Sequence, residues 1–169
     1  ARGFGCDIVV VWRGYGSARW PAGDTVRWRG PSGTEVILYH LPPDGYEFGG
    51  SLPTDTTAAA QRWARVQRVM RPRTTTGIAL LLNGADHHAR QLDYRKAIAA
   101  LADAARPDVV RAATMRDAAA AIVREAQRVK LPIVENELRD SYGYTWTLQG
   151  TFATRAAQKR RNAIAERLL

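Results

Sequence analysis

The stretch Gly77-Ile78-Ala79-Leu80-Leu81-Leu82-Asn83-Gly84-Ala85-Asp86-His87-His88 carries most of what this sequence says about its fold. An apolar run of this length, entered from three threonines and left through Asn-Gly, is typical of a buried strand in a parallel sheet. The polar residues that follow would then lie at the C-terminal end of that strand, where α/β proteins carry out their chemistry. One carboxylate and two imidazoles there could act as a general acid, bind sugar hydroxyls or bind a metal ion.

The remainder of the chain predicts strands that alternate with helices. Strands are expected at residues 7–12, 25–28, 35–41, 109–110 and 131–134. Helices are expected from Asp55 to about Met70, then at 92–104, at 115–129 after a Thr114 cap, and at 152–169. The turn at 30–33 joins two of the strands. Because there is no internal repeat and no clear linker, we expect one contiguous α/β unit over residues 1–169.

The composition is that of a globular protein. The chain has 169 residues, of which 46% are hydrophobic and 24% charged. It contains no apolar run of about 18 to 20 residues and no signal-peptide pattern, so no membrane association is expected. The single cysteine, Cys6, excludes an internal disulfide framework and a cysteine-based zinc site, which makes cytoplasmic localisation the default expectation. The lack of an initiator Met suggests an excised piece of a longer chain.

The net charge of +9 raises the alternative of a basic α/β module that binds nucleic acid or another acidic partner. That alternative predicts that the Arg residues at 62–73 and 155–161 share one exposed face. However, Arg is spread over most of the chain and only three of the 25 basic residues are Lys. We therefore interpret the charge mainly as a compositional bias and expect no nucleic-acid binding.

Polar side chains follow three of the predicted strands. They are Arg13, then Tyr46 with Glu47, then Asp86 with His87. If the strands are parallel neighbours, all of these residues lie on one rim, where the loops of barrel-like α/β enzymes build the active site. Carboxylates and Arg bind sugar hydroxyls, and aromatic rings pack against the apolar face of a sugar, so these residue types suit a carbohydrate.

Motifs along nearly the whole chain resemble one known family. In order, they are Val-Val-Trp-Arg13, then Val-Arg-Trp-Arg-Gly-Pro-Ser-Gly-Thr-Glu-Val-Ile-Leu with Leu-Pro-Pro-Asp-Gly-Tyr46, then Leu-Leu-Leu-Asn-Gly-Ala-Asp86-His87, then Glu137-Leu138-Arg139 with Gly150-Thr151-Phe152-Ala153-Thr154-Arg155 and Lys159. In this order and spacing, the chain resembles glycoside hydrolase family 38, the zinc-dependent retaining α-mannosidases, and its bacterial members most.

The resemblance implies a partial (β/α)7 barrel with parallel strands. The chain would be the middle to C-terminal part of the catalytic barrel, with the helix from Phe152 leading to a helical bundle. The full-length parent would hydrolyse terminal α-mannosides with retention, and its substrate would be an α-mannoside or a mannose-containing glycan. In the family, zinc is held by a His-x-Asp pair, the nucleophilic Asp and a His-His-Asp motif. No His-x-Asp motif is present here, and His87-His88 is followed by Ala89 rather than Asp. The nucleophilic Asp would also lie outside this chain. We therefore assign no metal ligand to this chain and expect it to be inactive alone.

The family's roles carry over to a few residues. Asp86 matches the general acid/base carboxylate, which needs a raised pKa to protonate the leaving oxygen. Tyr46, with Glu47 in place of the usual Asp, matches the pair that contacts the bound sugar. Arg13 matches an Arg of the active-site rim, and His87 is a further candidate for substrate contact.

Structural roles compete with each of these assignments. Asp86 could cap the following turn or the helix near Leu92, Tyr46 could anchor its loop, and Arg13 could pair with Asp7 or Asp24. The charged residues Glu137, Arg139 and Asp140 could form a surface ion network. The aromatic residues Trp12, Trp28 and Trp63 are expected in the core rather than as sugar platforms.

Overall fold

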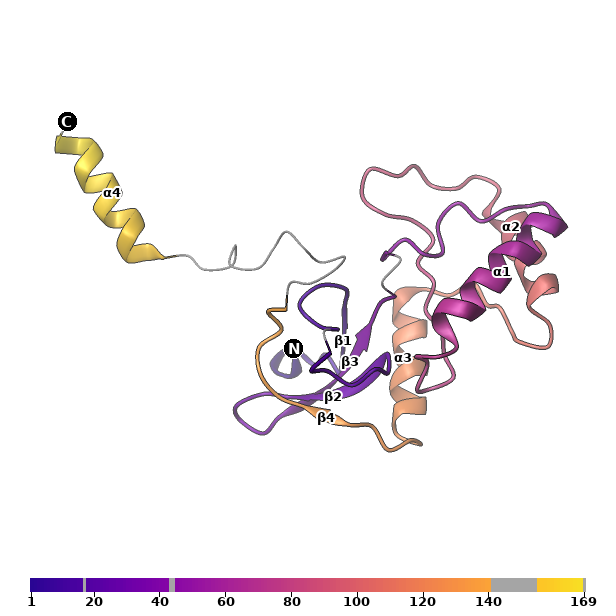
Figure 1. Ribbon diagram of the computed structural model, residues 1–169, viewed down its shortest axis with the longest axis horizontal. Coiled ribbons are helices and arrows are strands. Elements are labelled where there is room, and N and C mark those ends of the chain that lie inside the picture. The colour runs from indigo at the N-terminus through magenta and orange to yellow at the C-terminus, as the bar shows by residue number, and fades with distance from the viewer. Residues whose placement is uncertain (17, 43–44, 141–154, 169) are drawn as a thin grey trace.

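The computed structural model describes residues 1–16, 18–42, 45–140 and 155–168 (Figure 1). A 3-10 turn at Arg2–Phe4 precedes strands β1 (Ile8–Val11), β2 (Thr25–Arg29) and β3 (Glu35–His40). Helices α1 (Thr56–Met70), α2 (Tyr94–Ala105) and α3 (Met115–Ala126) follow, then strand β4 (Ile133–Val134) and helix α4 (Ala156–Leu168). The described chain is therefore a mixed α/β structure. None of its described helices is long and apolar enough to span a membrane.

The sheet is mixed rather than wholly parallel. Its strand order is β1-β3-β2-β4, with β1 parallel to β3 and β2 parallel to β4. Strands β2 and β3 are antiparallel, which agrees with the turn predicted at 30–33 and departs from the parallel strands that the family resemblance implies. The reason is the turn at 30–33, in which the Gly33 amide donates to the Gly30 carbonyl at 2.9 Å. So short a connection can join only antiparallel neighbours, because a parallel pair needs a crossover of a dozen residues or more.

The apolar run at 77–82 is not a strand, contrary to the prediction. It is an extended segment whose Ile78, Leu80 and Leu82 pack on the core cluster that contains Tyr39. The Leu80 amide donates to the Tyr39 hydroxyl at 2.9 Å. The segment is thus half-buried and is linked to β3 through a side chain, without the backbone pairing of a strand. The prediction of a strand at 109–110 is also wrong, since Val109 is largely exposed.

The helix starts follow the caps read from the sequence. The Asp55 carboxylate accepts from the Ala58 amide at 2.8 Å, and the Thr114 hydroxyl accepts from the Asp117 amide at 3.2 Å. Each side chain satisfies one of the backbone donors that a helix leaves unpaired in its first turn. The predictions for α1 and the start of α3 are therefore confirmed.

Two separate layers of packing hold the fold together. Helix α3 covers one face of the sheet, where Ile122 and Ala126 pack with Ile37 and Tyr39 of β3. Helices α1 and α2 lie beside each other away from the sheet (Figure 1). The half-buried Trp63 of α1 packs in this second layer, as expected for a core aromatic.

A buried polar network ties the start of β2 to the segment after α1. The fully buried Asp24 carboxylate accepts from the Thr25 hydroxyl at 2.9 Å, the Thr74 hydroxyl at 3.1 Å and the Thr75 amide at 3.1 Å. Three donors offset much of the desolvation of a buried carboxylate. Burial still raises the pKa of Asp24 above its ordinary value.

His40, at the end of β3, is a neutral imidazole in the same region. Its Nδ1 accepts from Arg73 Nη2 at 3.0 Å, because a guanidinium can only donate. Its Nε2 therefore carries the proton and donates to the Trp12 carbonyl at 3.2 Å. Burial, together with the positive charge of Arg73, lowers the pKa of His40 from 6.5 to about 4.

This shift predicts that the protein loses stability in mild acid. The unfolded chain takes up a proton at His40 near pH 6.5 and the folded chain only near pH 4. The contribution of His40 is therefore fully present above pH 6.5 and decreases as the pH falls to 4, by at most about 3 kcal/mol. The raised pKa of Asp24 has the opposite effect on stability. Protonation of its carboxyl group favours the folded state, so it offsets part of this loss in acid.

Urea unfolding at several pH values tests this prediction. The His40→Gln variant should show a flatter dependence of the unfolding free energy between pH 6.5 and 4. The matched control is His88→Gln, because His88 is exposed and should leave the slope unchanged. Equal slopes in the wild type and His40→Gln would contradict the assignment.

Candidate functional site

The predicted site residues come from three segments that end at one edge of the sheet. Trp12 and Arg13 follow β1 directly, and Tyr46 and Glu47 follow β3 after a short loop. Because β1 and β3 are parallel, their C-terminal ends meet at the same edge. Asp86 reaches this edge in the turn that follows the segment at 77–82.

Tyr46, Asp86 and His87 are in direct contact. The Tyr46 hydroxyl donates to Asp86 Oδ1, and His87 Nε2 lies 3.5 Å from Asp86 Oδ2. His87 adopts a left-handed backbone conformation, with φ of 63°, which is uncommon for a residue other than glycine. The turn is closed by the His88 amide, which donates to the Ala85 carbonyl at 3.3 Å. The structure thus brings together three of the five residues predicted from the sequence.

Arg13 joins the group through Trp12. The Trp12 ring meets the Tyr46 ring edge-on, with centroids 5.1 Å apart and planes at 71°. The Arg13 guanidinium lies over the Trp12 ring, 4.7 Å from its centroid. Arg13 is exposed, and the carboxylates suggested as alternative partners have other contacts: Asp7 pairs with Arg2 and Asp24 is bound by threonines. The Arg13 side chain therefore lies along the rim.

Glu47 is near Tyr46 but folds back over its own loop. Its carboxylate oxygens lie 2.8 and 2.9 Å from the point where a Cβ on Gly45 would be. Gly45 has φ of 120°, a backbone conformation that favours glycine. The negative charge of Glu47 contributes to a raised pKa of Tyr46, but the hydrogen bond to Asp86 is the main cause.

The electrostatics of Asp86 are those of an ionised carboxylate. Its side chain is 68% exposed. The hydrogen bond from Tyr46 is the main cause of a lowered pKa of Asp86, and the neighbouring His87 and His88 lower it further. This shift is opposite to the one a general acid needs. Asp86 does not cap α2, whose N-cap residue is Asp93.

Removing the Tyr46 hydroxyl should raise the pKa of Asp86 towards its ordinary value. The Tyr46→Phe variant keeps the ring against Trp12 and deletes only the donor, so the effect on the carboxylate is isolated. The pKa would be followed through the pH dependence of the Asp86 carboxyl 13C resonance. The control is Tyr94→Phe, which removes an exposed hydroxyl that accepts from Arg95. An unchanged Asp86 pKa in Tyr46→Phe would show that the hydrogen bond does not control it.

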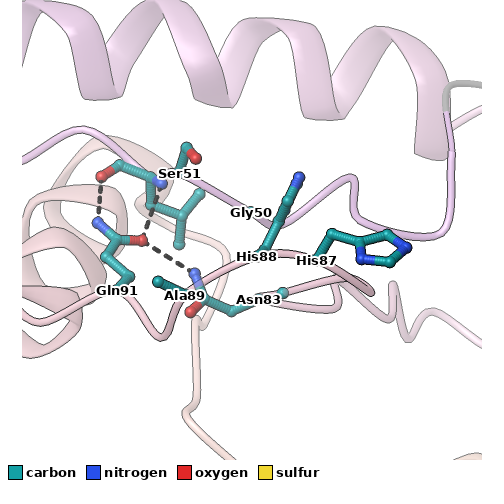
Figure 2. A pocket seen from close by; sticks show the side chains of 9 residues that line it. Gly50, Ser51, Asn83, His87, His88, Ala89 and Gln91 are labelled. Atoms are coloured by element: carbon teal, nitrogen blue, oxygen red, sulfur yellow. Dashed lines mark hydrogen bonds between the residues drawn. The ribbon is translucent and has the colours of Figure 1, made fainter.

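A hollow lies beside the Asp86 turn, between the loops at 50–52 and 83–91 (Figure 2). Its frame consists of Asn83 and Gln91, whose side-chain amides are joined by a 3.1 Å hydrogen bond. Sequence reasoning missed both residues. In the sequence, Asn83 stood out only as part of the Asn-Gly turn, and no pattern around Gln91 indicated a function.

A second polar cluster, at 135–140, reaches the same rim from the far end of the sequence. The Asp140 carboxylate accepts from Trp20 Nε1 and forms an ion pair with Arg19, with Nη2 and Oδ1 2.6 Å apart. The Asp140 amide donates to the Gly14 carbonyl at 3.1 Å. Glu137 pairs with Arg139 at the surface, as expected, but Asp140 instead fastens this segment to the loop after β1.

The described residues offer no metal centre. No group of three or more His, Cys, Asp or Glu side chains among them is placed to hold a metal ion. Zinc therefore does not fit a site built from this part of the chain alone. Arg62 of α1 is engaged with the backbone carbonyls of Gly50 and Ser51.

Comparison with known proteins gives an informative structural similarity. No family model and no curated protein matches this chain. A solved structure with a similar fold is an alpha-mannosidase from Enterococcus faecalis V583, with a TM-score of 0.62 and 25% sequence identity. The match covers 80% of this chain and 15% of the mannosidase chain. This chain therefore has a fold like that of part of an α-mannosidase and spans a small share of that protein's length.

Proposed function

We propose that this chain is a segment of a retaining, metal-dependent α-mannosidase of glycoside hydrolase family 38 that hydrolyses terminal α-mannosides. Residues 1–169 would form the middle to C-terminal part of a (β/α)7 catalytic barrel. The observation that carries the proposal is the contact of Tyr46 with Asp86 at one rim of a fold similar to part of a mannosidase. The nucleophile and the zinc ligands would belong to the rest of the parent polypeptide.

In this proposal, Asp86 is the acid/base and Tyr46 controls its protonation. Without substrate, the Tyr46 hydroxyl holds Asp86 ionised. A sugar that accepts the Tyr46 hydrogen bond and excludes water from the rim would remove the main cause of the lowered pKa and add desolvation, which raises it. Asp86 would then carry a proton for the leaving oxygen, and its carboxylate would next activate water.

Arg13 and Glu47 would help to bind the sugar. Stacking on Trp12 fixes the Arg13 guanidinium while leaving its edge free to donate hydrogen bonds to hydroxyl groups. Glu47 follows Tyr46 directly, and its carboxylate lies over Gly45. His87 would contact substrate on the other side of the Asp86 carboxylate.

The proposal predicts that the 169-residue chain alone does not hydrolyse an aryl α-mannoside, whereas the longer parent does. The reason is that the nucleophile and the metal ligands would lie on other segments. The measurement is aryl-alcohol release by each purified polypeptide under identical conditions. Turnover by the isolated chain would contradict the proposal that the catalytic site is divided between this chain and the rest of the parent polypeptide. The proposal also fails if the parent reading frame lacks a His-x-Asp motif and an Asp nucleophile upstream and a His-His-Asp motif downstream.

A further inference from the structure

We propose that Asn83 is a site of spontaneous deamidation, and that its conversion to aspartate or isoaspartate separates the loops at 49–52 and 83–91. The reactant is water, and the products are an acid and ammonia. The proposal stands apart from the proposed function, because it rests on the Asn83-Gly84 pair and on the contacts of the Asn83 side chain. The two loops border the hollow beside the Asp86 turn.

The backbone after Asn83 is open to this reaction. Asn83 and Gly84 are both exposed. Within the described chain, the Gly84 amide donates no hydrogen bond, so no acceptor holds its nitrogen in place. Gly84 has no side chain to crowd a five-membered ring, and its φ of 140° is a conformation that glycine adopts readily. The turn therefore offers an unhindered nitrogen next to the Asn83 side chain.

The reaction has two balanced steps. In the first, the Gly84 nitrogen gives its proton to a hydroxide ion and attacks Cγ of Asn83. A bond forms between this nitrogen and Cγ, the bond from Cγ to Nδ2 breaks, and Nδ2 takes a proton from water and leaves as ammonia, which regenerates the hydroxide. In the second step, water adds to either carbonyl of the cyclic imide and opens it. The net change is the uptake of water and the loss of ammonia.

The native hydrogen bonds of Asn83 depend on the atom that the reaction removes. Asn83 Nδ2 donates to the Gly49 carbonyl at 2.9 Å. It also donates to Gln91 Oε1 at 3.1 Å, across the gap between the two loops (Figure 2). In the aspartate product, a carboxylate oxygen replaces Nδ2 and can only accept. It faces two acceptor oxygens, so both attractive contacts become repulsive.

Gln91 cannot restore the link by reversing its own amide. Its Oε1 accepts from the Leu52 amide at 3.1 Å, and its Nε2 donates to the Leu52 carbonyl at 2.7 Å. Turning the amide over would place donor against donor and acceptor against acceptor at Leu52. The pairing with Leu52 therefore keeps Gln91 an acceptor towards residue 83, and deamidation breaks the link between the loops.

The same hydrogen bonds slow the reaction in the folded chain. Ammonia can leave only after Nδ2 has released both the Gly49 carbonyl and Gln91 Oε1. Each reaction therefore follows a local opening of the two loops, and the rate depends on how often they open. Once the amide is lost, the loops have no means of closing in the original way, so the change is irreversible.

The first test follows the side-chain amides of the purified 169-residue chain, held folded at mildly alkaline pH. Peptide mapping by mass spectrometry should show deamidation at Asn83, with isoaspartate among the products, while Asn136 and Asn162 keep their amides. These two are internal controls, because Asn136 precedes the bulkier Glu137 and Asn162 lies within α4, where it donates to Glu166 at 2.6 Å. An Asn83 amide that is lost no faster than the other two would overturn the proposal.

The second test changes the acceptor rather than the reacting residue. Gln91→Ala removes one of the two bonds that hold Nδ2 and should speed the deamidation of Asn83 about fivefold, the factor that corresponds to one ordinary hydrogen bond. The matched control is Gln61→Ala, because Gln61 is an exposed residue of α1 outside the two loops. Equal rates in the wild type and Gln91→Ala would overturn the protective role of the link.

The third test measures the structural consequence with Asn83→Asp, which imitates one product. The Leu52 amide, which donates to Gln91, should exchange its hydrogen with solvent several-fold faster, while the Ala58 amide, held by the Asp55 cap, should keep its rate. Asn162→Asp adds the same charge in α4 and should change neither amide. Unchanged exchange at Leu52 in Asn83→Asp would overturn the separation of the loops. Faster exchange at both amides would assign the effect to global unfolding and overturn it as well.

Discussion

Replacing Asp86 by Asn in the full-length parent is expected to lower kcat for an α-mannoside with a poor leaving group by roughly 10²- to 10⁴-fold. The amide has nearly the shape of the carboxylic acid and still accepts from Tyr46, but it cannot transfer a proton. A dinitrophenyl mannoside, whose leaving group needs no protonation, should lose less rate in the first step. Azide, which needs no general base, should restore turnover by forming mannosyl azide.

The control for this experiment is Asp103→Asn. Asp103 is an exposed carboxylate on α2 that pairs with its neighbour Arg106, 3.1 Å away, so its loss should leave kcat unchanged. A kcat for Asp86→Asn within a few-fold of the wild type on both substrates would show that Asp86 takes no part in the chemical step. Loss of activity without azide rescue would assign it to substrate binding instead.

Replacing Asp24 by Ala is expected to destabilise the fold by about 3 kcal/mol, because it leaves buried hydrogen-bond donors unpaired. The Thr25 and Thr74 hydroxyls and the Thr75 amide all donate to this carboxylate. The link between the start of β2 and the segment after α1 would be lost with it. The measurement is the free energy of unfolding in urea at neutral pH.

Asp24→Asn is the matched variant for this prediction. It keeps the volume and one acceptor oxygen, and it removes the charge that burial disfavours. It should therefore cost clearly less than Asp24→Ala. Equal losses for the two variants would show that the charge, rather than the hydrogen bonds, stabilises this region.

Local signals predicted much of the fold. Asp55 and Thr114 marked helix starts, and the turn at 30–33 marked the hairpin, because each acts on backbone groups within a few residues. The predicted meeting of Tyr46 with Asp86 also holds in the structure, since both follow segments that end at one edge. Their roles in catalysis stay predictions.

Other features depend on contacts distant in sequence and were therefore not predictable from local pattern. The run at 77–82 has the composition of a strand, but its partner is the hydroxyl of Tyr39 rather than another backbone. Asp24 looked like a possible partner for Arg13 and is instead bound by threonines about fifty residues away. Gln91 is an ordinary polar residue in the sequence, and only its contacts with Leu52 and Asn83 identify it as a part of the frame.

The fastening of Asp140 to the loop after β1 also bears on the order in which the protein folds. The Asp140 amide meets the Gly14 carbonyl, and a Cβ on Gly14 would lie only 2.4 Å from the Leu138 carbonyl oxygen. Nearly the whole described body lies between these partners in sequence, so the entropy of closing so long a loop must be overcome before they meet. We therefore expect the tether to form late, with the rim beside Arg13 completed after the sheet and its helices are in place. Mutations at this point would then act mainly on the rate of unfolding.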